Sequence, residues 1–305
     1  MRNGDMTRES TIAADRRPVD RPPVPRDRFR GVLLGLAVGD ALGAPAEFLT
    51  PVQVRDRWGV LDEMVGGGCH RVQPGEGTDA TEMMLALAEG LMADDFDPSD
   101  VVGRYRAWFA TGPRDVSLTT RTAMLALAAG TPWELASHRA YEILGSPTAG
   151  NGSVMRCAPV ALRYFFDGDA RRGVSLADSA LTHFDHLAGW SCVALNELLV
   201  AAMAGRFEES LPAIAASLDA EDSRVSQALR EATDAEPSEI CAGAFVLDSL
   251  KAAVWAVLHT ATFEGALVEI VNRGADAIPA RWLEALLVRE RATAAAAGLA
   301  VRATS

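Results

Sequence analysis

Polar side chains interrupt or end apolar helical stretches in four short segments, and these are the places where the chain could do chemistry. The first segment runs from Gly31 to Phe48 and contains Asp40 and, after a Gly-Ala-Pro turn, Glu47. A buried carboxylate is costly unless it is paired or used. Asp40 is therefore either a structural acid that accepts backbone hydrogen bonds or part of a binding site.

The second segment, Thr78-Asp79-Ala80-Thr81, lies where a helix is expected to begin. Threonine and aspartate are favoured at helix N-termini, so an ordinary cap explains them without any ligand. Taken alone, the segment is better explained as an ordinary helix cap.

The third segment begins with Gly150-Asn151-Gly152 and continues through Ser153, Val154 and Met155. Two glycines flanking an asparagine before a helix start leave backbone N–H groups open to an anion such as a phosphate. Most glycine-rich turns are only turns, which is the plainer reading.

The fourth segment, Thr182-His183-Phe184-Asp185-His186, follows a predicted helix that ends near Leu181. Its side chains could hold a ribose or orient a neighbouring group. The two histidines also have a spacing that can bind metal, but the segment offers only two such ligands. A solvated turn between two helices is the alternative reading.

Helical periodicity surrounds these segments, and it predicts an all-α fold. Apolar residues recur at helical spacing from Phe29 to Leu36 and again from Met83 to Leu91. No segment alternates as a strand would. Further helices are predicted near 99–108, 118–129, 133–143, 153–165, 174–183, 187–204, 207–218, 222–233, 243–259, 263–272 and 280–290. We expect residues 1–26, rich in Pro, Arg and Asp, to form a disordered tail, 27–292 one domain, and 293–305 a C-terminal tail.

Composition narrows the class of protein. The chain has 305 residues, 49% of them hydrophobic, which suits a single domain. Its net charge of −12 disfavours nucleic acid and anionic lipid as partners. The four cysteines are far apart, no apolar run approaches the about 20 residues that span a membrane, and no signal sequence is apparent. We expect a cytoplasmic protein without a disulfide framework or a zinc site.

The order and spacing of the four segments together resemble the ADP-ribosylglycohydrolase family. The matching features are Gly-Asp40-Ala-Leu-Gly, Thr78-Asp79, Gly-Asn151-Gly-Ser-x-Met-Arg-x-x-Pro and Thr182-His183. Leu250 to Thr260 and Ile278 to Trp282 also look like family segments. The resemblance covers about residues 28–290 and implies a compact all-α domain that hydrolyses the bond between an ADP-ribosyl group and its acceptor.

The resemblance also implies a pair of magnesium ions, and here this chain departs from the family pattern. The family's Thr-Asp-Asp-Thr motif reads Thr78-Asp79-Ala80-Thr81, so one carboxylate is missing. The family's C-terminal Asp-x-Asp-Thr motif is absent, together with a helix, and only Asp276 remains. Magnesium needs about six oxygen ligands in octahedral geometry. We therefore expect the ancestral magnesium site to be lost and no cofactor to be bound.

Two functions follow as hypotheses. One is an N-glycoside hydrolase acting without metal on an ADP-ribosyl or related riboside substrate, with Glu47 and Asp79 as catalytic residues. The other is a pseudoenzyme that binds ADP-ribose-like ligands without turnover. In both, the expected ligand-binding residues are Asp40, Thr78, Asn151, Gly152, Ser153, Val154, Met155 and His183. The expected partner is a small-molecule or ADP-ribosylated substrate, and the expected state is a monomer or weak homodimer.

Overall fold

The computed structural model describes residues 26–145 and 149–274, and within these ranges the fold is helical. Extended pairing in them is limited to two isolated antiparallel bridges, Gly67 with Val72 and Gly150 with Phe245. The prediction of an all-α fold is confirmed. Several predictions concern residues outside the described ranges. They are the N- and C-terminal tails, the helix near 280–290, and the loss of a helix near Asp276.

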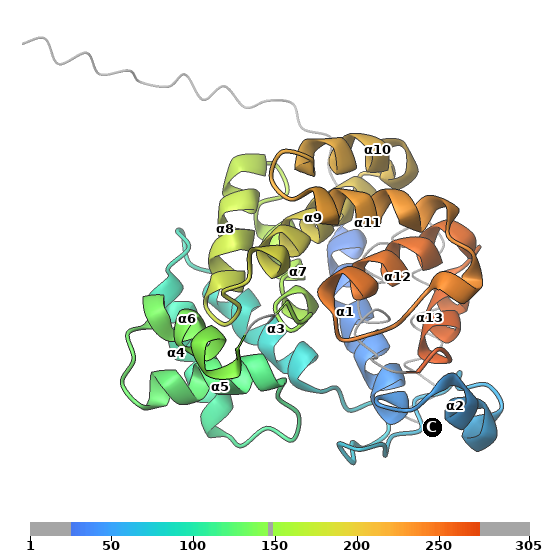
Figure 1. Cartoon of the computed structure of the whole chain (residues 1–305), viewed down its shortest axis with the longest axis horizontal. Helices are drawn as coiled ribbons and strands as arrows, with labels where there is room; N and C mark the ends of the chain where they lie inside the picture. Colours follow the sequence, from blue (N-terminus) through green and yellow to red (C-terminus); the bar gives the residue numbers. More distant parts are fainter. Residues whose placement is uncertain (1–25, 146–148, 275–305) are drawn as a thin grey trace, which may run out of the picture.

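The helices follow one another with short connections and surround a common core (Figure 1). Figure 1 shows α4, α5 and α6 gathered on one side, α12 and α13 on the other, and α1, α3, α7 and α9 between them. The α-helices are α1 Arg26–Gly43, α2 Pro51–Trp58, α3 Asp79–Gly90, α4 Pro98–Ala110, α5 Leu118–Ala128, α6 Trp133–Leu144, α7 Ala158–Arg163, α8 Gly168–Ala180, α9 His186–Met203, α10 Phe207–Leu218, α11 Ser223–Asp234, α12 Val246–His259 and α13 Phe263–Val271. Three short 3-10 helices join them: η1 Ala44–Ala46, η2 Val154–Arg156 and η3 Pro237–Glu239.

Helix α9 is the centre of the core. It packs against α7, α8, α10, α11 and α12, and most of its residues are buried. By length and composition, α9 and residues 26–46 are both apolar enough to cross a membrane, which corrects the expectation that no segment approaches that length. Each buries more than half of its residues against other helices, so core packing accounts for its apolar sequence.

Side-chain caps fix where several helices begin. The carboxylates of Asp97, Asp167 and Asp185 accept backbone N–H groups at the starts of α4, α8 and α9. Ser117 and Thr262 do the same for α5 and α13. These residue types satisfy N–H groups that have no partner within the helix. Helix α4 therefore begins after Asp97, at Pro98, one residue before the start expected from its sequence.

Two predicted helices differ from the observed ones for reasons of tertiary contact. Helix α8 begins at Gly168 rather than near 174, because its polar first turn is held by the Asp167 cap and by the buried Arg171, which pairs with Glu197 of α9. The stretch predicted as one helix over 153–165 is divided into η2 and α7 at Cys157.

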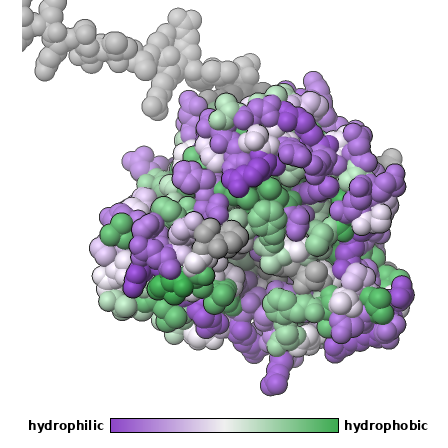
Figure 2. Space-filling view, viewed as in Figure 1, coloured by the Kyte–Doolittle hydropathy of each residue, from purple (hydrophilic) through white to green (hydrophobic). Residues whose placement is uncertain are grey.

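Hydrophobic side chains remain exposed over α5 and α6. Figure 2 shows hydrophobic colour on this part of the surface, whereas the part over α10 and α11 is mostly hydrophilic. The exposed apolar residues there are Leu118, Leu125, Leu135 and Ile143. The oligomeric state stays a prediction.

One buried ion pair joins the helices that surround the third and fourth sequence segments. The guanidinium of Arg156 lies 3.2 Å from the Asp178 carboxylate, and both side chains are fully buried. Arg156 also donates to the Gly152 carbonyl at 3.3 Å and to Thr182 Oγ1 at 2.9 Å. Tyr105 of α4 stacks under the guanidinium and donates its hydroxyl to Asp178 at 2.7 Å. Arg156 is thus a structural cation that fixes two loops at once.

Removing one member of this pair should destabilise the protein strongly. Asp178→Ala leaves the Arg156 charge buried without its carboxylate, and we expect the free energy of unfolding to fall by about 3–5 kcal/mol. Urea denaturation followed by circular dichroism measures this. Arg139→Ala breaks an exposed ion pair with Glu142 and serves as the control, with an expected loss below about 1 kcal/mol. Equal losses in the two variants would contradict a structural role for the buried pair.

Candidate active site

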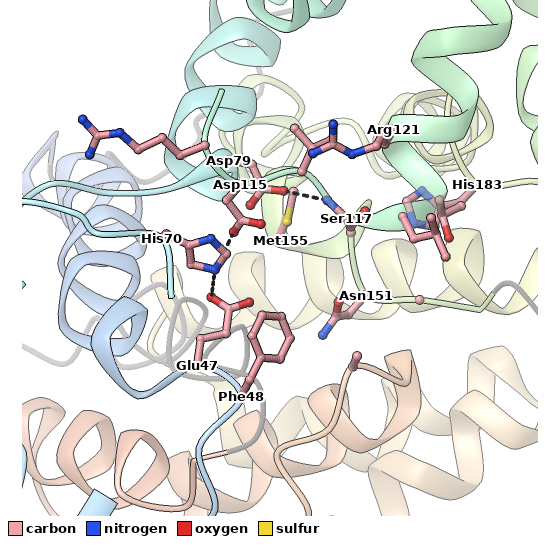
Figure 3. A pocket seen from close by; sticks show the side chains of 17 residues that line it. Glu47, Phe48, His70, Asp79, Asp115, Ser117, Arg121, Asn151, Met155 and His183 are labelled. Carbon is pink, nitrogen blue, oxygen red and sulfur yellow. Dashed lines mark hydrogen bonds and ion pairs between the residues drawn. The ribbon is translucent and has the colours of Figure 1, made fainter. Parts of the chain in front are cut away.

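A cavity of about 530 Å³ brings together residues from seven separate parts of the chain. This size is in the range of sites that hold small organic ligands. Figure 3 shows its lining side chains, with Glu47, His70 and Asp115 at one end and His183 at the other. The lining residues include Glu47, Phe48, His70, Asp79, Arg114, Asp115, Ser117, Arg121, Asn151, Gly152, Met155 and His183.

Glu47 is placed by the end of α1 and the 3-10 turn η1. The chain turns through Ala44, Pro45 and Ala46, all buried, and Glu47 follows as the C-cap residue with 6% of its surface exposed. The next residue, Phe48, has φ 63° and an exposed ring at the cavity wall. A left-handed backbone is unusual for a bulky side chain, and such conformations cluster at functional sites.

His70 reaches the cavity on a tight hairpin. Gly67 and Val72 exchange backbone hydrogen bonds of 2.7 and 3.1 Å, and His70 lies in the turn between them. Gly66, Gly67 and Gly68 all have positive φ, and a Cβ on Gly68 would lie 2.7 Å from the Ala44 carbonyl oxygen. Only glycine fits this approach. Gly68 therefore lets the hairpin pack directly against the turn that precedes Glu47.

Two carboxylates converge on the His70 imidazole. His70 Nε2 lies 3.2 Å from Glu47 Oε2 and 3.5 Å from Asp115 Oδ2. The three side chains are mostly buried, with exposures of 10% for His70, 6% for Glu47 and 14% for Asp115. The adjacent Cys69 thiol has a raised pKa because of burial and then because of the Glu47 and Asp115 charges, so it is not an activated nucleophile.

Asp40 binds the start of α3 rather than the cavity. Its Oδ2 accepts the backbone N–H groups of Thr78 at 2.7 Å and Thr81 at 3.1 Å, and the hydroxyl groups of both threonines also donate to its carboxylate. Asp40 is fully buried. A carboxylate at a helix N-terminus stabilises the helix through these N–H groups and the helix dipole. Asp40 thus joins the end of α1 to the beginning of α3.

Asp79, the first residue of α3, is the member of this segment that faces the main cavity. Its Oδ2 accepts the backbone N–H of Ser117 at 3.4 Å, and its Oδ1 lies 3.4 Å from the Thr78 hydroxyl. Thr78 lines a smaller adjoining cavity of about 210 Å³. Ala80 is fully buried in the hydrophobic core.

The Gly150–Met155 segment contributes part of its length to the cavity. Gly150, Asn151, Gly152 and Met155 line it. The Asn151 backbone N–H donates to the Ala244 carbonyl at 3.1 Å, and its Nδ2 donates to Ser249 Oγ at 2.9 Å, which fixes the turn to the start of α12.

Ser153 and Val154 of the same segment lie in the core. Both are fully buried, and neither lines the cavity. The Ser153 hydroxyl accepts from Ser179 at 2.8 Å, which ties this turn to α8. The cavity is thus lined by residues on both sides of Ser153 and Val154, while these two attach the segment to the core.

His183 closes the far end of the cavity. Its Nδ1 lies 2.8 Å from Thr182 Oγ1, while its Nε2 is buried without a hydrogen-bond partner among the described residues. Burial, and secondarily the Arg156 charge, lowers the pKa of His183 to about 3, so the ring is neutral near pH 7. Arg156 can only donate to the Thr182 hydroxyl, which leaves the hydroxyl proton for Nδ1. This arrangement favours a proton on Nε2, where it can be donated to a ligand.

The structure brings six of the ten predicted site residues to the main cavity. These are Glu47, Asp79, Asn151, Gly152, Met155 and His183. The other four, Asp40, Thr78, Ser153 and Val154, do not line it, and their contact with ligand stays a prediction. His70 and Asp115 were not predicted. The run of three glycines before Cys69-His70 is the sequence signal that could have indicated a tightly packed hairpin there.

Comparisons with known proteins agree with this geometry. Residues 21–277 match the model of the ADP-ribosylglycohydrolase family. The chain is 31% identical to the ADP-ribosyl-[dinitrogen reductase] glycohydrolase of Rhodospirillum rubrum, covering 84% of this chain and 82% of that protein. It is also 31% identical to the ADP-ribosylarginine hydrolase Tri1 of Serratia proteamaculans, over 87% of this chain and 76% of that protein. A solved structure described as an ADP-ribosylglycohydrolase-related protein complex superposes with a TM-score of 0.71 at 30% identity, covering 91% and 96% of the two chains.

The described residues at the start of α3 offer fewer oxygen ligands than the family motif that the resemblance implies. At the start of α3, Ala80 offers no oxygen and is buried among apolar side chains. The Thr78 hydroxyl is committed to the Asp40 carboxylate at 2.8 Å. Asp79 is then the one carboxylate that the segment offers to the cavity, and Asp276 lies outside the described residues. Hard cations need more oxygen ligands than this.

The neutral state of His183 predicts a pH dependence of stability. Its pKa falls from 6.5 in the unfolded chain to about 3 in the folded protein, so only the unfolded chain takes up a proton between these values. The contribution of His183 to the free energy of unfolding is fully present above pH 6.5. It falls by up to about 1.4 kcal/mol per pH unit as the pH drops toward 3. Unfolding free energies measured in urea at several pH values should show a shallower slope for His183→Gln. The exposed His138→Gln is the control, and identical slopes for wild type and His183→Gln would contradict this account.

Proposed function

The chain belongs to the ADP-ribosylglycohydrolase family, and from this we propose that it hydrolyses the N-glycosidic bond between an ADP-ribosyl group and its acceptor. The observation that carries the proposal is the placement of Glu47, a buried carboxylate at the wall of a ligand-sized cavity that also contains Asp79, Asn151 and His183. The relatives named above are hydrolases of ADP-ribosylated proteins or of ADP-ribosylarginine.

Cleavage of an N-glycoside develops positive charge on the ribose, and carboxylates favour that charge. We assign proton transfer to Glu47, which can accept a proton from the attacking water or donate one to the leaving nitrogen. Water adds its hydroxyl to the ribose carbon and its remaining proton ends on the acceptor nitrogen. Asp79, which lines the same cavity, orients ribose or water.

Binding of the ADP-ribosyl group is assigned to the other end of the cavity. The Gly150–Gly152 turn presents backbone to the ligand, and a Cβ on Gly152 would lie 3.2 Å from His183 Nε2. Glycine at 152 therefore gives the imidazole room to face a ligand. Arg121 is exposed beside the same cavity and supplies positive charge for a diphosphate.

We further propose that the reaction is independent of the magnesium pair of the family, because the described carboxylates at the start of α3 are too few to hold one. The other expectations from the sequence are kept as proposals. They are a cytoplasmic location, a monomer or weak homodimer, and an absence of nucleic-acid or membrane partners, for which the net charge of −12 is the support.

Glu47→Gln should abolish turnover while keeping the fold and the ligand site. We expect kcat on an ADP-ribosylarginine substrate to fall by about 10²- to 10⁴-fold, because an amide cannot transfer the proton. ADP-ribose affinity, measured by calorimetry, should change only a few-fold. Glu63→Gln, an exposed acid, is the matched control.

Two results would contradict the proposal. Full activity in Glu47→Gln would remove Glu47 from the chemistry. ADP-ribose binding without turnover in the wild-type protein, across arginine-, serine- and small-molecule-linked substrates, would leave a pseudoenzyme that only binds.

Magnesium should have no specific effect on turnover. If the pair is absent, initial rates in the wild-type protein at fixed ionic strength should change less than twofold as magnesium is raised to millimolar levels. A saturable increase in rate would instead show that the ancestral site is retained, with ligands supplied from outside the described residues.

A further inference from the structure

Phe48 carries an exposed aromatic ring on a backbone conformation that suits glycine. The Leu49 N–H donates to the Ala46 carbonyl at 3.0 Å, which closes a four-residue turn. Glu47 has φ −59° and ψ 135°, and Phe48 has φ 63°. These angles match a type II turn, whose third position needs a positive φ and normally holds glycine or asparagine. An aromatic residue at this position is strained.

Contacts on both sides of the turn keep it in this shape. Before the turn, Gly68 packs directly against Pro45. After the turn, the Leu49 carbonyl oxygen lies so close to Gly274 that a side chain at position 274 has no room. Thr50 then caps the start of α2. The surrounding chain therefore imposes a positive φ on position 48, whichever side chain it carries.

The Phe48 ring itself contributes little to the fold. It is 68% exposed, and its centroid lies 6.1 Å from that of the tilted His70 ring. Glycine at this position would relieve the strain with little loss of buried area. The ring lines the main cavity beside Glu47 (Figure 3). A strained and exposed aromatic residue on a cavity wall is explained by contact with a ligand better than by packing.

The position of the ring decides which part of a substrate it can reach. Glu47 is 6% exposed and Phe48 is 68% exposed, so the cavity wall passes from its interior to its mouth between these two residues. The proposed function places the scissile bond at Glu47, which transfers a proton to the leaving nitrogen. From that bond the acceptor has to extend toward solvent, because the rest of an acceptor protein lies outside the cavity. The diphosphate is assigned to the Gly150–Gly152 end, so the Phe48 ring meets the acceptor.

A phenyl ring recognises flat groups with delocalised electrons. Guanidinium groups stack on aromatic faces, and the negative face of the ring attracts their positive charge. An acceptor linked through a hydroxyl oxygen has neither a plane nor a charge at the linking atom, so it gains little from the ring. The ring therefore favours acceptors that are linked through a planar nitrogen group.

We propose that Phe48 is a specificity-determining residue, whose ring stacks on a planar, nitrogen-linked acceptor group at the mouth of the cavity. This role rests on the proposed hydrolase function, because that function places the acceptor beside Glu47. It accounts for an aromatic side chain at a position whose backbone suits glycine.

The test compares binding of ADP-ribosylarginine, which carries a planar acceptor group, with binding of ADP-ribose, which lacks one. Calorimetry uses the Glu47→Gln protein as the parent, so that ADP-ribosylarginine is not consumed. We expect Phe48→Leu in this parent to weaken ADP-ribosylarginine binding about 3- to 30-fold and to change ADP-ribose binding less than about twofold. Phe48→Trp, which keeps an aromatic ring, should bind both ligands as the parent does. Phe166→Leu alters an exposed phenylalanine outside the cavity lining and is the matched control.

Three results of this comparison would overturn the proposal. Equal weakening of both ligands in Phe48→Leu would place the ring on the ADP-ribosyl group. Unchanged binding of both ligands would remove the ring from the site. A parent protein that binds neither ligand would overturn the proposed function as well. Failure of the hydrolase function alone is seen separately, as a wild-type protein that binds ADP-ribosylarginine but does not release arginine from it.

Stability separates a ligand-binding role from a structural one. Phe48→Gly places glycine where φ is positive, so we expect the urea midpoint of unfolding to equal or exceed that of the wild type. In the Glu47→Gln parent, the same change should weaken ADP-ribosylarginine binding as Phe48→Leu does. A lower urea midpoint in Phe48→Gly would show that the fold needs the ring, and would also overturn the proposal.

Discussion

The ion pair between Arg156 and Asp178 is the interaction on which the binding end of the cavity depends. A buried guanidinium has five N–H groups that must find acceptors, and here they reach the Asp178 carboxylate, the Gly152 carbonyl and the Thr182 hydroxyl. The two loops that line the cavity therefore both accept hydrogen bonds from the buried Arg156 guanidinium. Their geometry is set by the need to satisfy that charge, which water cannot do at zero exposure.

The catalytic end of the cavity is organised by a second buried acid, Asp40. It belongs to α1 but accepts the N–H groups at the start of α3, so the two helices keep a fixed relative position. Glu47 extends from the end of the first helix and Asp79 begins the second. The hydrogen bonds of Asp40 therefore fix the positions of Glu47 and Asp79, although neither of these carboxylates takes part in them. Sites supported in this way hold their geometry better than sites on independent loops.

Local patterns in the sequence were sufficient for most helices, because their apolar faces repeat with the helical period. The helix predicted over 207–218 is observed with those bounds, and the one over 263–272 ends one residue earlier. The predictions failed where a distant residue decides the local structure. Helix α12 begins at Val246 rather than 243 because Ala244 and Phe245 pair with the Ala149–Asn151 turn. Likewise, nothing near His70 in the sequence indicates that Asp115, 45 positions later, lies beside it.

The charges that line the cavity bear on where the proposed diphosphate binds. Glu47, Asp79 and Asp115 place three carboxylates around a space that, under the proposed function, receives an anionic diphosphate. Arg121 offsets only part of this charge, and Arg114 is already paired with Glu76. Because like charges repel strongly where water is excluded, the diphosphate is assigned to the end of the cavity that carries the Gly150–Gly152 turn, away from Glu47 and Asp115.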